Sequence, residues 1–394
     1  MVRVGDERLR AHRLSVVALA SLVLLVSLVD LPRASARGAH PWIAVAGDIA
    51  CPPGRPQKPK TCLPQETAAL WRRGGVIGGS GLKAALTLGD NQYPNGSLAA
   101  FEDPRRCGGA RTCGFDASWG AASRSYRQRV AIWAAAGFHD WKNPDPPAGG
   151  CTMRDLAVPT DACGLWRYGQ DRTNVVVDPN ANEGMYVRRV QRNSPHPLDV
   201  VILDGGLCNV HPSSCAAADS TQATFLRSRL ASLPAADCVV VALSHAPFSA
   251  YGHGDLVGPP SDITYMTGVW EAMFAPSVDA AHRPDLLVAA HDHEYQRFTP
   301  MDVGGVTGVQ GGVPEIVVGT GGGGIDPGPA DYPAEGDHQR SGDCPRSATC
   351  YPPEAVDLHF GVVRLAIDPQ RGRISTTFFR IGGNPRDAHR YGCS

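Results

Sequence analysis

The sequence predicts an α/β fold in which two mixed β-sheets pack face to face and helices flank them. Short apolar runs of strand length alternate with helical segments early in the chain, and the C-terminal part is rich in strands. Neither an internal repeat nor a long linker is visible, so we expect one domain from about residue 38 to residue 394.

Composition supports a large folded domain and argues against two classes of partner. The chain has 394 residues, 43% of them hydrophobic, and a formal net charge of −1. A near-neutral chain carries no electrostatic footprint for nucleic acid or for an anionic membrane surface. The 45 glycines and 33 prolines predict many loops between short elements.

Residues 1–36 have the pattern of a secretory signal peptide. Four arginines precede an almost purely apolar run, Leu14–Val29, and the small residues of 34–36 form a cleavage site. The alternative is an uncleaved membrane anchor, but the run is short for a membrane span and is closed by Asp30 and Pro32. We therefore predict a secreted protein with no stable membrane insertion after cleavage.

The twelve cysteines fit an exported protein, because thiols pair in an oxidising compartment. Proximity in sequence predicts five pairs, and the two cysteines that remain would tie the end of the chain to its body. The predicted pairs are Cys51–Cys62, Cys107–Cys113, Cys151–Cys163, Cys208–Cys215, Cys344–Cys350 and Cys238–Cys393. None of these spacings is the Cys-x-x-Cys of a zinc or redox site, so we interpret all twelve as structural.

Apolar or β-branched runs that end at turn residues predict the strands. We expect strands over residues 42–48, 85–88, 174–177, 199–203, 239–243, 286–290, 314–319, 359–367 and 373–381. The first ends in Gly-Asp and the second is followed by Gly-Asp, and histidines follow the runs over 239–243 and 286–290.

Helical spacing of apolar residues predicts four helices. They are expected over residues 65–73, 126–136, 220–233 and 267–274. The third has the clearest boundaries, because Ser220 can cap its first turn and Pro234 follows its end.

Polar side chains follow five of the predicted elements, at the point where each element ends. These residues are Asp48, Asp90, His139, His245 and the pair His291 and His293. Ligands of open α/β sheets bind beyond the carboxyl ends of the strands, and a polar group buried there without a partner costs stability. Carboxylates combined with imidazoles are typical of Fe, Mn or Zn sites rather than Ca sites. The pattern therefore predicts a metal centre at this edge.

The order of these motifs resembles that of the calcineurin-like metallophosphoesterases. The motifs are Gly47-Asp48, Gly89-Asp90-Asn91-Gln92-Tyr93, Gly137-Phe138-His139-Asp140, Ser244-His245 and His291-Asp292-His293-Glu294-Tyr295. The tyrosine three residues after the second aspartate is similar to the purple acid phosphatase branch, as is Ala50 in the place of a histidine. The resemblance spans nearly all of the chain after residue 36 and implies a metallophosphoesterase sandwich.

The resemblance implies a role for each of these residues. Asp48, Tyr93 and His293 would hold a first metal ion, His245 and His291 a second, and Asp90 would bridge the two. A phenolate ligand favours Fe(III) at the first position, and the second would take Fe(II), Zn or Mn. Hydroxide formed at the metal pair would attack the phosphorus of a small-molecule phosphate ester, and His139 would donate to the leaving oxygen or steady the transition state. His253 is either a further histidine of the substrate pocket or an exposed loop residue.

One residue departs from the family's pattern. The third motif of the family carries an Asn that binds the second metal, and Phe138 stands there in this sequence. Water or Asp140 could complete the second metal's shell, Asn143 could replace the missing ligand, or the second site could stay half empty.

The resemblance implies a phosphatase acting on monoesters. A phosphodiesterase of the same fold and a non-catalytic secreted binding protein are the alternatives. The sequence predicts no oligomeric state.

Two other motifs point to no additional activity. The run Gly319–Gly324 lacks the Gly-Lys-Ser/Thr of a P-loop and no helix follows it, so nucleotide binding is not indicated. We interpret it as a flexible turn after a strand, at the rim of the site. No Gly-x-Ser-x-Gly elbow is present, so a serine hydrolase has no support.

Overall fold

The computed structural model describes residues 40–52, 62–108, 111–112, 114–141, 164–172, 174–176, 184–210, 215–249, 266–325 and 353–393. The elements below all belong to one compact unit, Pro41–Ser394. The predicted signal peptide, Asn143 and His253 lie outside the described residues.

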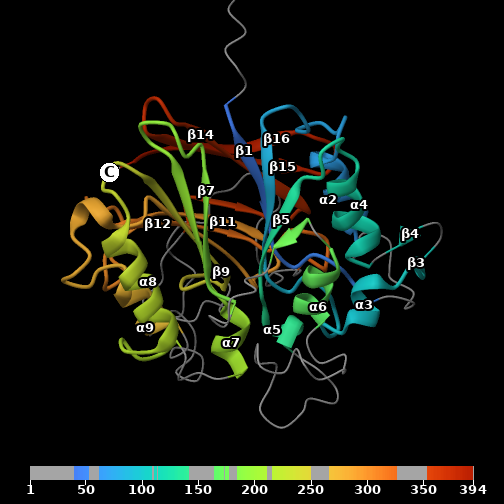
Figure 1. Cartoon of the computed structure of the whole chain (residues 1–394), viewed down its shortest axis with the longest axis horizontal. Coiled ribbons are helices and arrows are strands. Elements are labelled where there is room, and N and C mark those ends of the chain that lie inside the picture. The colour runs from blue at the N-terminus through green and yellow to red at the C-terminus, as the bar shows by residue number, and fades with distance from the viewer. Residues whose placement is uncertain are drawn as a thin grey trace, which may run out of the picture. The chain divides into compact units, whose positions relative to one another are not determined.

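Two seven-stranded mixed sheets form the fold, as the sequence predicts (Figure 1). The first sheet has the strand order β16-β15-β14-β1-β2-β5-β6. Its strands are β1 (Trp42–Ala46), β2 (Leu82–Leu88), β5 (Ala131–Ala135), β6 (Val175–Val176), β14 (Gly361–Asp368), β15 (Arg373–Arg380) and β16 (Pro385–Gly392). Strands β1, β2, β5 and β6 are parallel, whereas β14, β15 and β16 extend the sheet by antiparallel pairing.

The second sheet repeats this plan, with the order β13-β11-β12-β10-β9-β8-β7. Its strands are β7 (Tyr186–Val190), β8 (Leu198–Ile202), β9 (Cys238–His245), β10 (Leu286–Ala290), β11 (Tyr295–Met301), β12 (Val313–Val318) and β13 (Ala355–Asp357). Strands β8, β9, β10 and β12 are parallel, and the flanking strands are antiparallel. Each sheet therefore has a parallel centre whose strands end at one edge.

Helices cover the outer faces of the sheets, and a two-stranded ribbon, β3 (Arg106–Gly108) with β4 (Arg111–Thr112), lies apart from them. The helices are α2 (Pro64–Trp71), α3 (Leu98–Glu102), the π-helix η1 (Asp116–Gly120), α4 (Ala121–Arg124), α5 (Phe138–Trp141), α6 (Gly164–Asp171), α7 (Gly205–Val210), α8 (Thr221–Ser232), α9 (Thr267–Ala272) and the 3₁₀ helix η5 (Ala280–His282). In Figure 1, α8 and α9 lie together beside the second sheet, and α2 and α4 beside the first. Among the described residues, none of the helices combines the length and the apolar character needed to cross a membrane.

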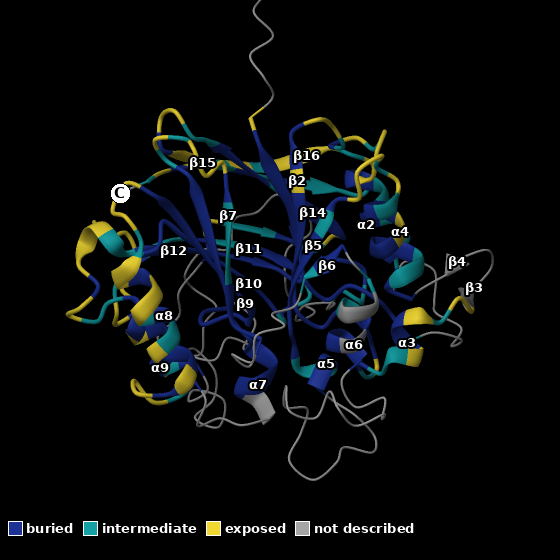
Figure 2. Ribbon diagram, viewed as in Figure 1, coloured by how far each residue is buried: buried dark blue, intermediate teal, exposed yellow. Residues whose placement is uncertain are grey.

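Alternation along β9 shows how the layers are built. Val240 and Ala242 belong to the large core that also holds residues of β1, β2 and β5. Val239 and Val241 point to the opposite face, into a second core with residues of α8 and α9. Both faces of the strand are therefore buried, which explains its unbroken apolar sequence. Figure 2 shows the central strands as buried and the outer sides of α8 and α9 as exposed.

The predicted helix over 126–136 is wrong, because β5 occupies Ala131–Ala135. Its Ala-Ile-Trp-Ala-Ala sequence has no β-branched majority, yet it pairs in parallel with both β2 and β6. Tertiary burial on both faces outweighs the helix preference of alanine here. The sequence also failed to reveal four strands at or beside the sheet edges. These are β7, β11, β13 and β16.

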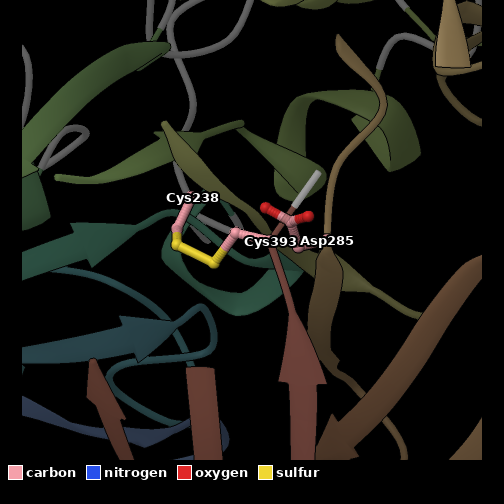
Figure 3. Close-up of side chains that lie close together, drawn as sticks. All are labelled: Cys238, Asp285 and Cys393. Atoms are coloured by element: carbon pink, nitrogen blue, oxygen red, sulfur yellow. A yellow bond between two sulfur atoms is a disulfide. The ribbon is translucent and has the colours of Figure 1, made fainter. Parts of the chain in front are cut away.

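Three predicted disulfides are confirmed and the others fall partly or wholly outside the described residues. Cys51–Cys62, Cys208–Cys215 and Cys238–Cys393 are bonded, with Cα atoms 6.0, 5.3 and 5.0 Å apart. The last pair joins the start of β9 to the residue after β16, so it ties the second sheet to the end of the first (Figure 3). The predicted cap of α8 is also confirmed, since the Ser220 hydroxyl accepts a hydrogen bond from Ala223 N.

A close approach of the two sheets at Gly47 predicts a measurable loss of stability. A Cβ at Gly47, after β1, would lie 2.3 Å from the Cβ of Ala290, the last residue of β10. Gly47→Ala should therefore lower the free energy of unfolding by about 1–3 kcal/mol, the usual cost of overpacking. Gly79→Ala is the matched control, because its Cβ would meet nothing within 4 Å. Urea unfolding measures both, and equal midpoints for the two variants would contradict the close approach.

Candidate metal centre

The loops that follow β1 and β2 run side by side and bring three candidate ligands together. Asp48 N donates to Gly89 O at 3.1 Å, and Tyr93 N donates to Ala50 O at 2.8 Å. These hydrogen bonds continue the parallel pairing of the two strands beyond their ends. Asp48 therefore lies beside Asp90 and Tyr93, at the carboxyl edge of the first sheet.

Three candidate ligands have a backbone conformation that non-glycine residues seldom adopt. The φ angles are +55° at Asp48, +46° at Asp90 and +76° at His291. Aspartate and histidine enter this left-handed region more readily than bulky residues, but it still carries a conformational cost. Each of the three residues lies one or two positions beyond the end of a strand. The tertiary structure around it holds the chain in a turn there, and strand propensity does not predict that turn.

The Tyr93 hydroxyl is the centre of the first group of candidate ligands. It donates to Asp48 Oδ1 at 2.6 Å and lies 3.1 Å from Asp90 Oδ2 and 2.9 Å from His293 Nε2. Asp48 Oδ1 and His293 Nε2 are 3.3 Å apart. Asp48 is fully buried and Asp90 is 2% exposed. Two carboxylates, a phenol and an imidazole from both sheets thus converge on one point.

His245 and His291 form the second group. Their rings stack with centroids 4.1 Å apart and planes 28° from parallel. His245 is buried at the end of β9, and His291 follows β10. The two groups are joined by a hydrogen bond from His291 N to Asp48 Oδ2 at 3.0 Å. The six candidate ligands therefore lie in two neighbouring groups, and Asp90 contacts the first.

The charges of the site favour a bound cation. Burial acts to raise the pKa of Asp48, but the charge of His293 and hydrogen bonds from His293 and Tyr93 hold that pKa below its ordinary value. The pKa of Asp90 is raised, first by burial and then by the negative charge of Asp48. Two buried carboxylates this close repel each other when both are ionised, and a cation between them removes that cost.

The pKa values of Tyr93 and His245 fit the same interpretation. Burial, followed by the charges of Asp48 and Asp90, raises the pKa of the Tyr93 phenol well above its ordinary value. A metal ion would therefore have to displace that proton before the phenol oxygen could bind it. Burial, followed by the charge of His291, keeps the pKa of His245 well below its ordinary value, so its imidazole is neutral and able to bind metal.

When Tyr93 is left out, no three of the candidate ligands have their ligand atoms all within 4.8 Å of one another. Among the residues that the structure describes, the one set of three Cys, His, Asp or Glu side chains with ligand atoms all within 4.8 Å of one another is Cys238, Asp285 and Cys393. That set is no metal site, because its two sulfurs form a disulfide (Figure 3). At the candidate centre the donor set fits hard or borderline metals, and the phenol oxygen is the atom that gathers it.

His139 and Phe138 lie in α5, beside the first group. The His139 ring centroid is 4.3 Å from that of Tyr93, and His139 N donates to Asp90 Oδ1 at 2.7 Å. His139 Nδ1 is 2.7 Å from Pro94 O, a carbonyl that can only accept, so Nδ1 carries the proton. Nε2 is therefore the nitrogen available for other partners. Phe138 is half-buried with its ring 5.3 Å from that of His139, and it offers no ligand atom.

Sequence reasoning missed the residues that support Asp90. Asp140 accepts hydrogen bonds from Asn91 N at 3.0 Å, Asn91 Nδ2 at 2.8 Å and Gly137 N at 2.9 Å. Asn91 Nδ2 also donates to Ala135 O at 2.8 Å. Both oxygens of Asp140 are thus engaged by the loops after β2 and β5, which argues against Asp140 as the substitute ligand. In the sequence, the position of Asn91 next to Asp90 was the one indication of a supporting role, and it did not indicate that Asp140 is the partner of Asn91.

The buried Asp140 predicts a pH dependence of stability. Burial, followed by the charge of Asp90, raises its pKa to about 7. A group whose pKa is higher in the folded state stabilises the fold below its unfolded pKa and loses that contribution as the pH rises. In protein treated with a chelator, the unfolding free energy of the wild type relative to Asp140→Asn should fall between about pH 4 and pH 7, by up to about 1.4 kcal/mol per pH unit.

Urea unfolding at several pH values measures this difference. The Asn variant is the matched control, because other titrating groups are common to both proteins. A difference that stays constant, or that grows in favour of the wild type as the pH rises, would contradict the raised pKa.

The fold is similar to those of several solved structures. A purple acid phosphatase from yellow lupin (Lupinus luteus) seeds, PPD1, superposes with a TM-score of 0.53 and 13% identity over 89% of this chain and 53% of its own. This chain thus spans about half the length of the lupin protein. GAP50, the anchor in the inner membrane complex of Plasmodium, has a TM-score of 0.49 and 13% identity over 90% of this chain and 89% of its own. PhoD has a TM-score of 0.49 and 12% identity over 90% and 70%.

Sequence comparison adds no further relative. No family model matches the chain, and no curated protein matches it at a significant level. Identity of 13% supports a common fold and nothing finer. The chain therefore has the two-sheet α/β fold of a purple acid phosphatase.

Proposed function

We propose that this protein is a secreted, metal-dependent phosphoesterase that hydrolyses small phosphate monoesters at a dinuclear centre. The observation that supports this most is the convergence of Asp48, Asp90 and His293 on the Tyr93 hydroxyl, with His245 and His291 beside them. The likeness of the fold to a purple acid phosphatase agrees with it. The three disulfides and the apolar N-terminal segment support export.

The residues divide into two metal positions. Asp48, Tyr93 and His293 would hold the first ion and His245 with His291 the second, while Asp90 would lie between them. Two bound cations would neutralise phosphate oxygens and lower the pKa of a bound water. Fe(III) suits the first position because of the phenol, and Fe(II), Zn or Mn suits the second.

The protein's own groups would then position and protonate the substrate. His139 is held by its backbone N–H on Asp90 and by its Nδ1 proton on Pro94 O. Its Nε2 points to other partners, and from the imidazolium form, which carries a second proton there, it would donate that proton to the leaving oxygen. The tilted ring contact of His139 with Tyr93 keeps this donor next to the first metal position.

Phe138 favours a second candidate function, that of a non-catalytic binding protein. It supplies no ligand to the second position, and the oxygens of Asp140 are engaged elsewhere. Water is then the simplest remaining ligand for the second ion. Metal content per chain distinguishes the two functions, because the enzyme requires two ions and the binding protein one or none.

Hydrolysis of p-nitrophenyl phosphate by metal-loaded protein tests the proposal. Asp90→Asn should reduce turnover by about 100-fold or more, because it removes the charge shared by the two positions. Asp219→Asn is the matched control, since Asp219 is an exposed carboxylate far along the chain from every candidate ligand. Bis-p-nitrophenyl phosphate distinguishes a phosphodiesterase. Equal activity of Asp90→Asn and the wild type would overturn the enzymatic proposal.

Phe138→Asn should restore the missing ligand. An amide oxygen at this place in α5 adds a donor of the kind that divalent metals accept, so the affinity for the second ion should rise about tenfold or more. Phe138→Leu is the control, because it shortens the ring without adding a ligand atom. Calorimetric titration of Zn or Mn into protein with the first position filled measures the affinity. Unchanged affinity in the Asn variant would mean that another group already fills that coordination position.

A further inference from the structure

The run Gly319–Gly324, called the glycine loop below, packs against the candidate ligands of the first metal. It follows β12 of the second sheet, yet its backbone bonds to the end of β1 in the first sheet. Gly321 N donates to Gly47 O at 2.9 Å, and Gly323 N donates to Asp48 O at 2.6 Å. The loop therefore crosses from one sheet to the other at the candidate centre.

Further hydrogen bonds fix the glycine loop at its start. Gly319 N donates to Glu294 O at 3.0 Å, one residue after His293. The Thr320 hydroxyl donates to Gly361 O at 3.0 Å, and Gly361 N returns a hydrogen bond to Thr320 O at 3.1 Å. Backbone hydrogen bonds thus anchor the glycine loop to three separate segments of the chain.

The absence of side chains lets the loop touch two candidate ligands directly. A Cβ on Gly323 would lie 2.7 Å from Tyr93 Cε2, and a Cβ on Gly324 would lie 3.0 Å from His293 Nδ1. Glycine is thus favoured by close packing, strongly at Gly323 and more mildly at Gly324, and not by an unusual backbone angle. Any larger residue must displace the phenol or the imidazole, or move the loop.

We propose that the glycine loop is a positioning element that holds the Tyr93 phenol and the His293 imidazole in the orientation that binds the first metal ion. The inference deepens the proposed function and rests on it. Close-packed backbone resists small displacements, so a ring in contact with it keeps its orientation. Groups that orient metal ligands change metal affinity by about 10- to 100-fold when they are lost.

The full chain loaded with Fe(III) gives a direct test, because an iron–phenolate bond absorbs visible light. Gly323→Ala should shift or weaken this band and lower iron affinity by about tenfold or more. Gly324→Ala, whose Cβ meets only the imidazole, should lower affinity with a smaller change in the band. Gly79→Ala is the matched control, because its Cβ would meet nothing within 4 Å, and Tyr93→Phe should abolish the band.

Thermal unfolding of chelator-treated protein reports whether each variant folds. If Gly323→Ala does not fold, the milder contact of Gly324→Ala decides the inference through iron affinity. A folded Gly323→Ala with the band and affinity of the wild type would overturn the positioning role and leave the proposed function intact. A wild type that shows no band and retains no iron would overturn the first metal position, and the positioning role with it.

Discussion

The meeting of the two sheets at the ends of β1 and β10 determines the position of every candidate ligand. Gly47 lies so close to Ala290 that no side chain fits between them. Next to this contact, Asp48 accepts a hydrogen bond from His291 N. The loops after β2 and β12 both form backbone hydrogen bonds with Asp48. Because close-packed cores resist compression, the separation of the sheets fixes the separation of the ligands. A site built on two sheets thus acquires the rigidity of the core beneath it.

Electrostatics gives this closeness a chemical consequence. Asp48 and Asp90 are buried where the two sheets meet, so water cannot screen the repulsion between their charges. The structure meets part of the cost with N–H donors, since His139 N donates to Asp90 and His291 N donates to Asp48. The pKa of Asp90 nevertheless stays above its ordinary value. A cation bound here would be attracted by the remaining negative charge of the two carboxylates. It would also have to displace the proton of the Tyr93 phenol.

Strand propensity predicted the architecture where sequence and burial agree. The Val-rich β9 and the Leu-rich start of β10 were found because strands buried on both faces read as continuous apolar runs. The alanine-rich β5 was misread as a helix, and the polar β16 at the sheet edge gave no signal. Burial by neighbouring strands decides such segments, and no local pattern encodes it.

The candidate site follows the same division. The six candidate ligands could be identified from the motifs, because a polar residue at the end of an apolar run is visible in the local sequence. The supporting contacts could not be read in this way. Asp140 reaches Asn91 across 49 residues, and Gly323 reaches Asp48 across the two sheets. Positive φ at Asp48, Asp90 and His291 is likewise imposed by the tertiary structure. Sequence therefore identifies donor atoms, whereas their orientation depends on long-range packing.

The two candidate metal positions differ in how firmly they are built. The first has a carboxylate, a phenol and an imidazole that contact one another, and the backbone of the glycine loop packs against the phenol and the imidazole. The second has two stacked imidazoles, and Phe138 stands in the sequence where the family carries a further ligand. A ligand set that is already oriented loses less entropy on binding, so the first ion should bind more tightly than the second. Under the proposed function, catalysis by two ions would depend on the weaker position, and Asp90 would be the residue through which the firmly held ion stabilises the other.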